Sequence, residues 1–109
     1  GIGRPRVEPS FVASVIDRMI AVEDADSIGA MRALSERLGR GVGGSTGTNL
    51  VVCAQLIEEM AAAGQKGSVV TLLCDGGERY SCTYYDDTWL ADRGVDWQPA
   101  AERMRKMLA

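Results

Sequence analysis

Apolar segments of two kinds alternate along this 109-residue chain, and glycine-rich turns separate them. Apolar side chains recur at helical spacing in 27–38 and 48–63, whereas 69–74 is a continuous apolar run. The β-branched side chains between residues 12 and 22 also allow a strand near 18–22. A continuous apolar run is typical of a strand buried on both faces of a sheet. The alternation predicts an α/β fold in which helices flank part of a mostly parallel sheet.

The expected helices begin and end at residues that favour those positions. Side-chain oxygens cap a helix N-terminus, proline suits its first turn, and glycine ends it in the left-handed conformation. The residues expected at helix starts are Asp24 or Asp26, Ser45 or Thr46, Asp87, and Pro99, and those expected to end helices are Gly39 and Gly64.

Composition excludes several classes of function. The chain has no histidine, which rules out a Ser-His-Asp hydrolase and a histidine-based zinc site within it. A net charge of −3 argues against binding to nucleic acid, and no apolar run approaches the ~18 residues that span a membrane. The three cysteines indicate reduced, buried thiols and a cytoplasmic protein. We expect residues 1–109 to form one α/β segment without a metal site.

The glycine-rich turn at 39–47 matches two motifs in letters only. Its glycines fit G-x-G-x-x-G, but they follow a helix where the dinucleotide fingerprint requires a strand. They also fit G-x-S-x-G, but that nucleophile needs a histidine. Two interpretations stay open: Gly43–Thr46 could hold a phosphorylated ligand at a helix N-terminus, or the glycines only allow tight packing.

A second turn, CDGGERY at 74–80, directly follows the apolar run. Ligands in open α/β sheets bind at the carboxyl ends of strands, so Asp75 is placed to face such a crevice. Its alternative role is a local turn or helix cap. Glu78 and Arg79 are expected to be solvated or to pair with each other.

Three stretches together resemble one family: GIG at 1–3, GVGGSTGTN at 41–49 and LLCDGGERYSCT at 72–83. In order and spacing they are similar to the closing third of the cysteine synthases that depend on pyridoxal 5′-phosphate (PLP). That family has fold type II and includes the O-acetylserine sulfhydrylases and cystathionine β-synthases. The resemblance extends from Gly1 to about Asp96.

The resemblance implies that this chain is the C-terminal part of a large PLP-binding domain. The family's lysine that binds PLP covalently matches no position here, because Lys66 and Lys106 lie in other contexts. No catalytic residue is therefore expected in the chain. The implied partners are the remainder of a parent chain, a second copy in a homodimer, and a small amino-acid substrate.

The resemblance also implies which residues line the cofactor site: Gly1, Gly3, Asp75 and Gly76. Gly1 and Gly3 match a glycine loop beside the cofactor ring. Gly76 stands where the family usually has a serine whose hydroxyl bonds the pyridine nitrogen. The partner of that nitrogen affects how strongly PLP withdraws electrons. Because Gly76 has no hydroxyl, we expect a water to take its place. Cysteine synthesis and cysteine desulfhydration both stay open. The rival function is a non-catalytic module that binds a phosphorylated ligand at Gly43–Thr46.

Overall fold

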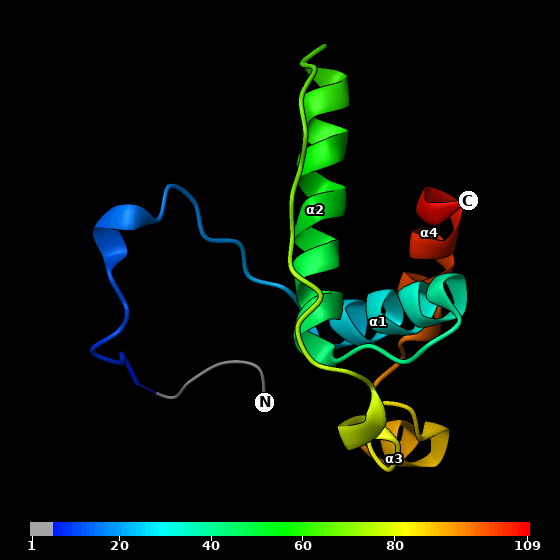
Figure 1. The fold of residues 1–109 in the computed structure, drawn as a ribbon. Coiled ribbons are helices and arrows are strands. Elements are labelled where there is room, and N and C mark those ends of the chain that lie inside the picture. The colour runs from blue at the N-terminus through cyan, green and yellow to red at the C-terminus, as the bar shows by residue number, and fades with distance from the viewer. Residues whose placement is uncertain (1–5) are drawn as a thin grey trace.

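Helices make up nearly all the regular structure in this computed structural model, which describes residues 6–109. Two are single turns of 3-10 helix and four are α-helices (Figure 1). In chain order they are η1 (Ala13–Val15), α1 (Asp24–Leu38), α2 (Gly44–Ala62), η2 (Glu78–Tyr80), α3 (Asp87–Asp92) and α4 (Gln98–Leu108).

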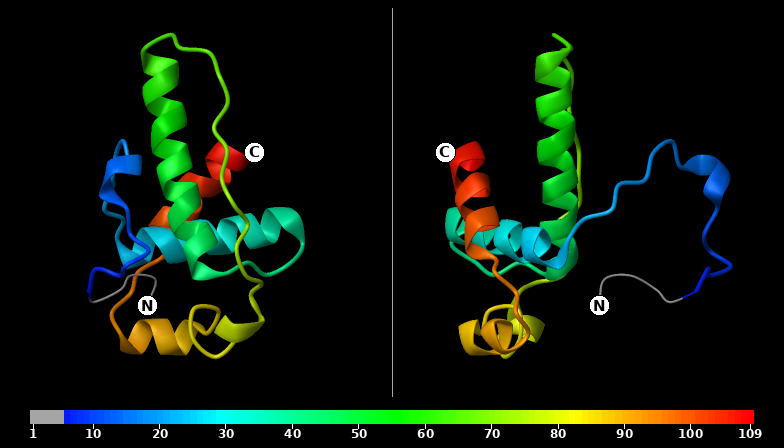
Figure 2. Two further views of the ribbon diagram at one scale, coloured as in Figure 1. Left: turned by 60° about the vertical axis from the view of Figure 1, so that its left-hand side comes forward. Right: turned by 180° about the vertical axis from the view of Figure 1, so that it is seen from behind.

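The prediction of an α/β fold with a parallel sheet is wrong for this structure. Within residues 6–109 the only β pairing is an isolated antiparallel bridge between Val42 and Gly76. The 69–74 run is not a buried strand, because Val70 is 87% exposed and Leu72 is 73% exposed. It runs back along α2 and has no strand beside it (Figures 1 and 2). A strand needs a partner for its N–H and C=O groups, and neither 69–74 nor 18–22 has one among the residues that the structure describes.

The first turn of helix α2 packs closely against α1. Gly47 has no side chain there, and an added Cβ would lie 2.8 Å from the Cβ of Met31. Beside it, the hydroxyls of Ser27 and Thr48 are hydrogen-bonded at 2.8 Å. Met31 is fully buried, so this contact lies at the centre of the molecule.

Helix α4 packs on another face of α1, and again a glycine allows the close contact. A Cβ on Gly29 would lie 2.6 Å from the Cβ of Ala100 and 2.7 Å from the carbonyl oxygen of Trp97. Ala30 and Met104 are buried in the cluster beside this contact. Two small residues therefore allow both helices to approach α1 closely.

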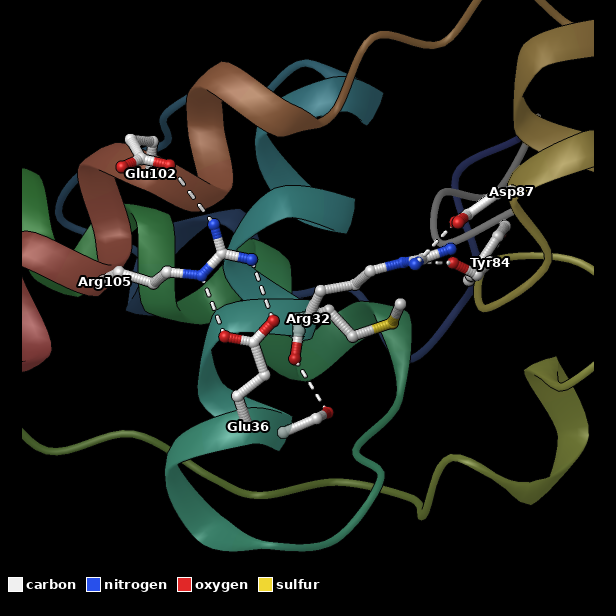
Figure 3. A network of polar contacts seen from close by, with 8 residues as sticks. Arg32, Glu36, Tyr84, Asp87, Glu102 and Arg105 are labelled. Atoms are coloured by element: carbon white, nitrogen blue, oxygen red, sulfur yellow. Dashed lines mark hydrogen bonds and ion pairs between the residues drawn. The ribbon is translucent and has the colours of Figure 1, made fainter.

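Arg32, whose side chain is 13% exposed, connects α1 to Tyr84 and to the first residue of α3 (Figure 3). Its guanidinium pairs with Asp87 at 2.7 Å, donates to the carbonyl of Tyr84 at 3.1 Å, and lies 4.1 Å from the ring centroid of Trp97. On the exposed side of α1, Arg105 of α4 binds Glu36 at 2.8 Å. These contacts fix α3 and α4 relative to α1.

The helix boundaries were predicted well and their caps less well. Gly39 ends α1 with φ 68°, and Pro99 lies in the first turn of α4, as expected. The N-terminal residue flanking α1 is Glu23, that of α2 is Gly43, and neither makes a side-chain capping bond. Helix α3 is capped by Asp86, whose carboxylate accepts from the N–H of Trp89 at 2.9 Å.

The cysteines are all free, but they are not all buried. Cys74 and Cys82 are exposed and Cys53 is half-buried, so the expectation of buried thiols is wrong. No helix within residues 6–109 combines the length and apolar character needed to cross a membrane.

Candidate functional site

The two glycine-rich turns singled out in the sequence lie against each other. We call residues 41–48 and 74–80 together the paired turns. The N–H of Gly43 donates to the carbonyl of Asp75 at 3.0 Å, and Val42 forms its β bridge with Gly76. The hydroxyl of Thr46, expected to cap α2, instead accepts from the N–H of Cys74 at 3.1 Å. Backbone and hydroxyl bonds therefore hold the paired turns in one register.

Glycine is required where the paired turns touch. A Cβ on Gly77 would lie 2.8 Å from the Cα of Gly41, and a Cβ on Gly41 would lie 3.1 Å from the Cα of Gly77. Gly77 is buried in this contact. Side chains at these positions would separate the two backbones, so the packing interpretation of the glycines describes this end of the turn.

Tyr85 fastens the first turn to α1. Its hydroxyl donates to the carbonyl of Val42 at 2.7 Å and accepts from the same residue's N–H at 3.0 Å. The hydroxyl of Ser35 lies 2.5 Å from that of Tyr85. The sequence analysis does not identify this role, since the pairing joins residues 50 positions apart and has no local signal.

Asp75 lies inside the paired turns. The hydroxyl of Tyr80 donates to its Oδ2 at 2.6 Å, which raises the pKa of Tyr80 above its ordinary value. Its Oδ1 is buried without a hydrogen-bond partner among the described residues, and it fills the space beside the Cα of Gly43. Tyr80 in turn stacks on Tyr84, with ring centroids 5.1 Å apart. The carboxylate therefore faces the N-terminus of α2.

Glu78 folds back over Gly76. A Cβ built on Gly76 would lie 3.0 Å from the carboxyl carbon of Glu78 and closer still to its Oε2. Glu78 is exposed, and its carboxylate makes no ion pair or hydrogen bond within residues 6–109. Of the two alternatives expected for Glu78 and Arg79, the pair is not formed in that part of the chain, and both residues are exposed to solvent. An unpaired carboxylate thus occupies the place of a side chain at position 76.

A cavity of about 250 Å³ opens beside the N-terminus of α2. Gly44 and Ser27 line it on the helix side, and Tyr84, Trp89 and Arg93 line it from the C-terminal half. The guanidinium of Arg93 lies 3.8 Å from the centroid of the Trp89 ring. The cavity is adjacent to the paired turns and could admit part of a small molecule.

The remaining predicted site residues lie elsewhere. Gly1 and Gly3 are outside the residues that the structure describes. Lys66 is exposed in the turn after α2, at the opposite end of that helix from the paired turns, and Lys106 is exposed on α4. Residues 6–109 contain no group of three side chains that could hold a metal ion. No lysine in this part of the chain lies in the paired turns.

Comparison with curated proteins identifies relatives over most of the chain. It is 58% identical over 96 residues to an L-cysteine desulfhydrase of Mycobacterium tuberculosis, a match that covers 88% of this chain and 26% of the relative. It is 43% identical over 91 residues to an N-(2-amino-2-carboxyethyl)-L-glutamate synthase of Ralstonia nicotianae, a match that covers 84% of this chain and 26% of that relative. It is 41% identical over 73 residues to a cysteine synthase of Aquifex aeolicus, a match that covers 67% of this chain and 22% of that relative.

The chain belongs to the PLP-dependent cysteine synthase family. It spans about a quarter of the length of the curated relatives that it matches. No family model matches it, and no solved structure matches it. The resemblance inferred from the paired turns and the first glycines is therefore confirmed at the level of the family.

The paired turns offer a polar group to a PLP molecule but no lysine that could anchor it covalently. They provide an exposed carboxylate, that of Glu78, which is unpaired within residues 6–109 and can accept a hydrogen bond from a ligand. They provide no lysine for the covalent link.

Proposed function

We propose that this chain forms one wall of the cofactor site in a PLP-dependent enzyme of cysteine metabolism. The observation that carries the proposal is the 58% identity to a cysteine desulfhydrase across 88% of the chain, which includes both paired turns. When bound, PLP would withdraw electrons from the α-carbon of an amino acid so that a substituent on its β-carbon can leave. The substrate is a small amino acid.

The residues of this chain would hold the cofactor in position and would not take part in the covalent chemistry. The direct contact of Gly41 and Gly77 lets the two turns lie close enough together to form one surface. The Asp75–Tyr80 hydrogen bond and the Tyr85–Val42 bonds hold the two turns rigid. Rigid placement of a wall contributes to catalysis because the reacting groups need no further ordering. The covalent lysine would come from outside residues 1–109.

Desulfhydration is the reaction that the identities favour. The chain is 58% identical to the desulfhydrase and 41% identical to the cysteine synthase. In desulfhydration the C–S bond of cysteine breaks, and cysteine and water yield sulfide, pyruvate and ammonia. Cysteine synthesis would instead replace the leaving group of an activated serine with sulfide.

Further polypeptide and a second copy are part of this proposal. Apolar side chains of Val70, Leu72 and Leu73 are 87%, 73% and 51% exposed, which favours their burial by other parts of a longer protein. We propose a homodimeric, cytoplasmic enzyme, and three free cysteines are compatible with a reducing compartment.

The rival function, binding of a phosphorylated ligand at Gly43–Thr46, meets an obstacle. The Asp75 carboxylate lies against Gly43, where it would repel an anion approaching the N-terminus of α2. No side-chain cation among the described residues is hydrogen-bonded to that carboxylate. This geometry favours the cofactor-wall proposal over the rival.

Borohydride reduction after incubation with PLP tests the proposal. The complete enzyme that contains this chain should acquire one reduced PLP group, and mass spectrometry should locate it on a lysine outside residues 1–109. The reduced enzyme should no longer release sulfide from cysteine. Labelling of Lys66 or Lys106 as the single modified lysine, or tight binding of inorganic phosphate in place of PLP, would contradict the proposal.

A further inference from the structure

The cavity of about 250 Å³ between α1 and the C-terminal half is lined by one charged side chain of each sign. Asp24 lines it from the first turn of α1, and Arg93 lines it from the residue that follows α3. We propose that this cavity binds a small α-amino acid with an apolar side chain. The inference goes beyond the proposed function, because no residue of 74–80 lines the cavity and no contact with PLP is needed.

The two charges are free to bind a ligand. Neither Asp24 nor Arg93 forms an ion pair within residues 6–109. One nitrogen of Arg93 donates to the carbonyl of Trp89 at 3.4 Å, and the guanidinium has further N–H groups that can bind a carboxylate. The Asp24 carboxylate can bind an ammonium group, and it would repel a ligand that carried only negative charge. A carboxylate together with an ammonium group is the charge pattern of a free amino acid.

Aromatic and aliphatic side chains line the cavity beside these charges. The rings of Tyr84 and Trp89 meet edge to face, with their centroids 5.9 Å apart. Ile28 and Val95 add aliphatic surface. A lining of this kind favours an apolar ligand side chain, because such a side chain leaves water when it binds. The volume is below the ~300–1,000 Å³ of pockets that hold drug-sized ligands, so it suits a molecule as small as an amino acid.

Contacts outside the cavity hold its aromatic wall in place. Asp86 accepts a hydrogen bond from the N–H of Trp89 at 2.9 Å, and the guanidinium of Arg93 lies 3.8 Å from the centroid of the Trp89 ring. Tyr84 stacks on Tyr80, with ring centroids 5.1 Å apart. A wall that is already ordered loses little conformational entropy when a ligand binds.

Equilibrium dialysis of the complete enzyme with radiolabelled L-leucine tests the inference. The enzyme is first reduced with borohydride, so that bound PLP can form no link to an amino acid. We expect saturable binding of leucine both before and after reduction. Arg93→Gln and Asp24→Asn should each weaken binding by about 10- to 100-fold, because each removes a hydrogen bond between charged groups. The control Arg37→Gln alters an exposed arginine of α1 that does not line the cavity, and it should leave the affinity unchanged.

Two analogues of leucine assign the charges without relying on a variant. Leucinamide lacks the carboxylate and 4-methylpentanoate lacks the ammonium group, so each should bind the wild-type enzyme more weakly than leucine. In Arg93→Gln, leucine should lose its advantage over leucinamide. Equal binding of either analogue and leucine to the wild-type enzyme would overturn the inference.

The outcomes separate this inference from the proposed function. No saturable binding of leucine to the wild-type enzyme overturns the inference, whether or not the variants fold. Binding that disappears on reduction also overturns it, because leucine would then occupy the PLP site. In both cases a lysine still carries PLP, and the proposed function stands. An enzyme that binds leucine but acquires no PLP would overturn the proposed function alone.

Discussion

Substitution of Gly47 by alanine tests the packing of α2 on α1. The new Cβ would lie 2.8 Å from the Cβ of Met31, 2.9 Å from the N–H nitrogen of Met31, and closer still to the carbonyl oxygen of Ser27. Two of these three atoms are backbone, and Met31 is fully buried, so neither helix can yield by rotating a side chain. The helices must move apart.

The magnitude follows from two opposing effects. Overpacking of a filled core costs about 1–3 kcal/mol, and backbone contacts place this case at about 3. Alanine favours a helix over glycine by about 1 kcal/mol, so the free energy of unfolding should fall by about 2 kcal/mol. For a domain of this size, the melting temperature should fall by ~10 °C.

Thermal and urea unfolding followed by circular dichroism measure this change. The matched control is Gly67→Ala, whose Cβ would meet only the flexible end of Met60 at 3.2 Å. We expect the control to change stability by less than about 0.5 kcal/mol. Equal or greater stability of Gly47→Ala would refute the reasoning, because the gain in helix propensity would then be unopposed.

Two further predictions concern titrating side chains. The hydrogen bond to Asp75 raises the pKa of Tyr80, so ultraviolet titration should show one late-ionising tyrosine that Tyr80→Phe removes and Tyr84→Phe retains. The stability that this hydrogen bond contributes is present below the pKa of tyrosine in the unfolded chain, and it is lost as pH rises through the pKa of Tyr80 in the folded protein. Ionisation of Tyr80 at the ordinary pKa of tyrosine would contradict this prediction. The hydrogen bond from Arg18 lowers the pKa of Glu59 from 4.5 to about 2, which carbon-detected NMR should record. The small stabilisation from this ion pair is lost as pH falls through about 2. Arg18→Gln should return the titration midpoint of Glu59 toward 4.5. An unchanged midpoint in that variant would mean that the ion pair is absent in solution.

Local signals in the sequence predicted the helices well. Apolar spacing located the helices. Gly39 marked a helix end because glycine readily adopts the left-handed conformation, and Pro99 marked a helix start because proline suits the first turn. The caps were harder to predict, since a hydroxyl near a helix start can bond elsewhere. Thr46 bonds the N–H of Cys74 and leaves Gly43 as the N-cap of α2.

Long-range pairing explains what was missed. The apolar run at 69–74 suggested a buried strand, but a strand requires a neighbour, and no strand lies beside this run within residues 6–109. The contact between Ser35 and Tyr85 has no local signature. The resemblance drew attention to Gly76, and its predicted place at the cofactor stays a prediction; only the three-dimensional structure shows that Glu78 fills the space beside it.

The central claim is that the paired turns form a wall of a PLP site. A crystal structure of the complete enzyme with bound PLP would measure it directly. We predict that the pyridine edge of the cofactor lies against residues 75–78, with the covalent lysine outside residues 1–109. A cofactor bound elsewhere, with solvent or another segment against residues 75–78, would contradict the claim.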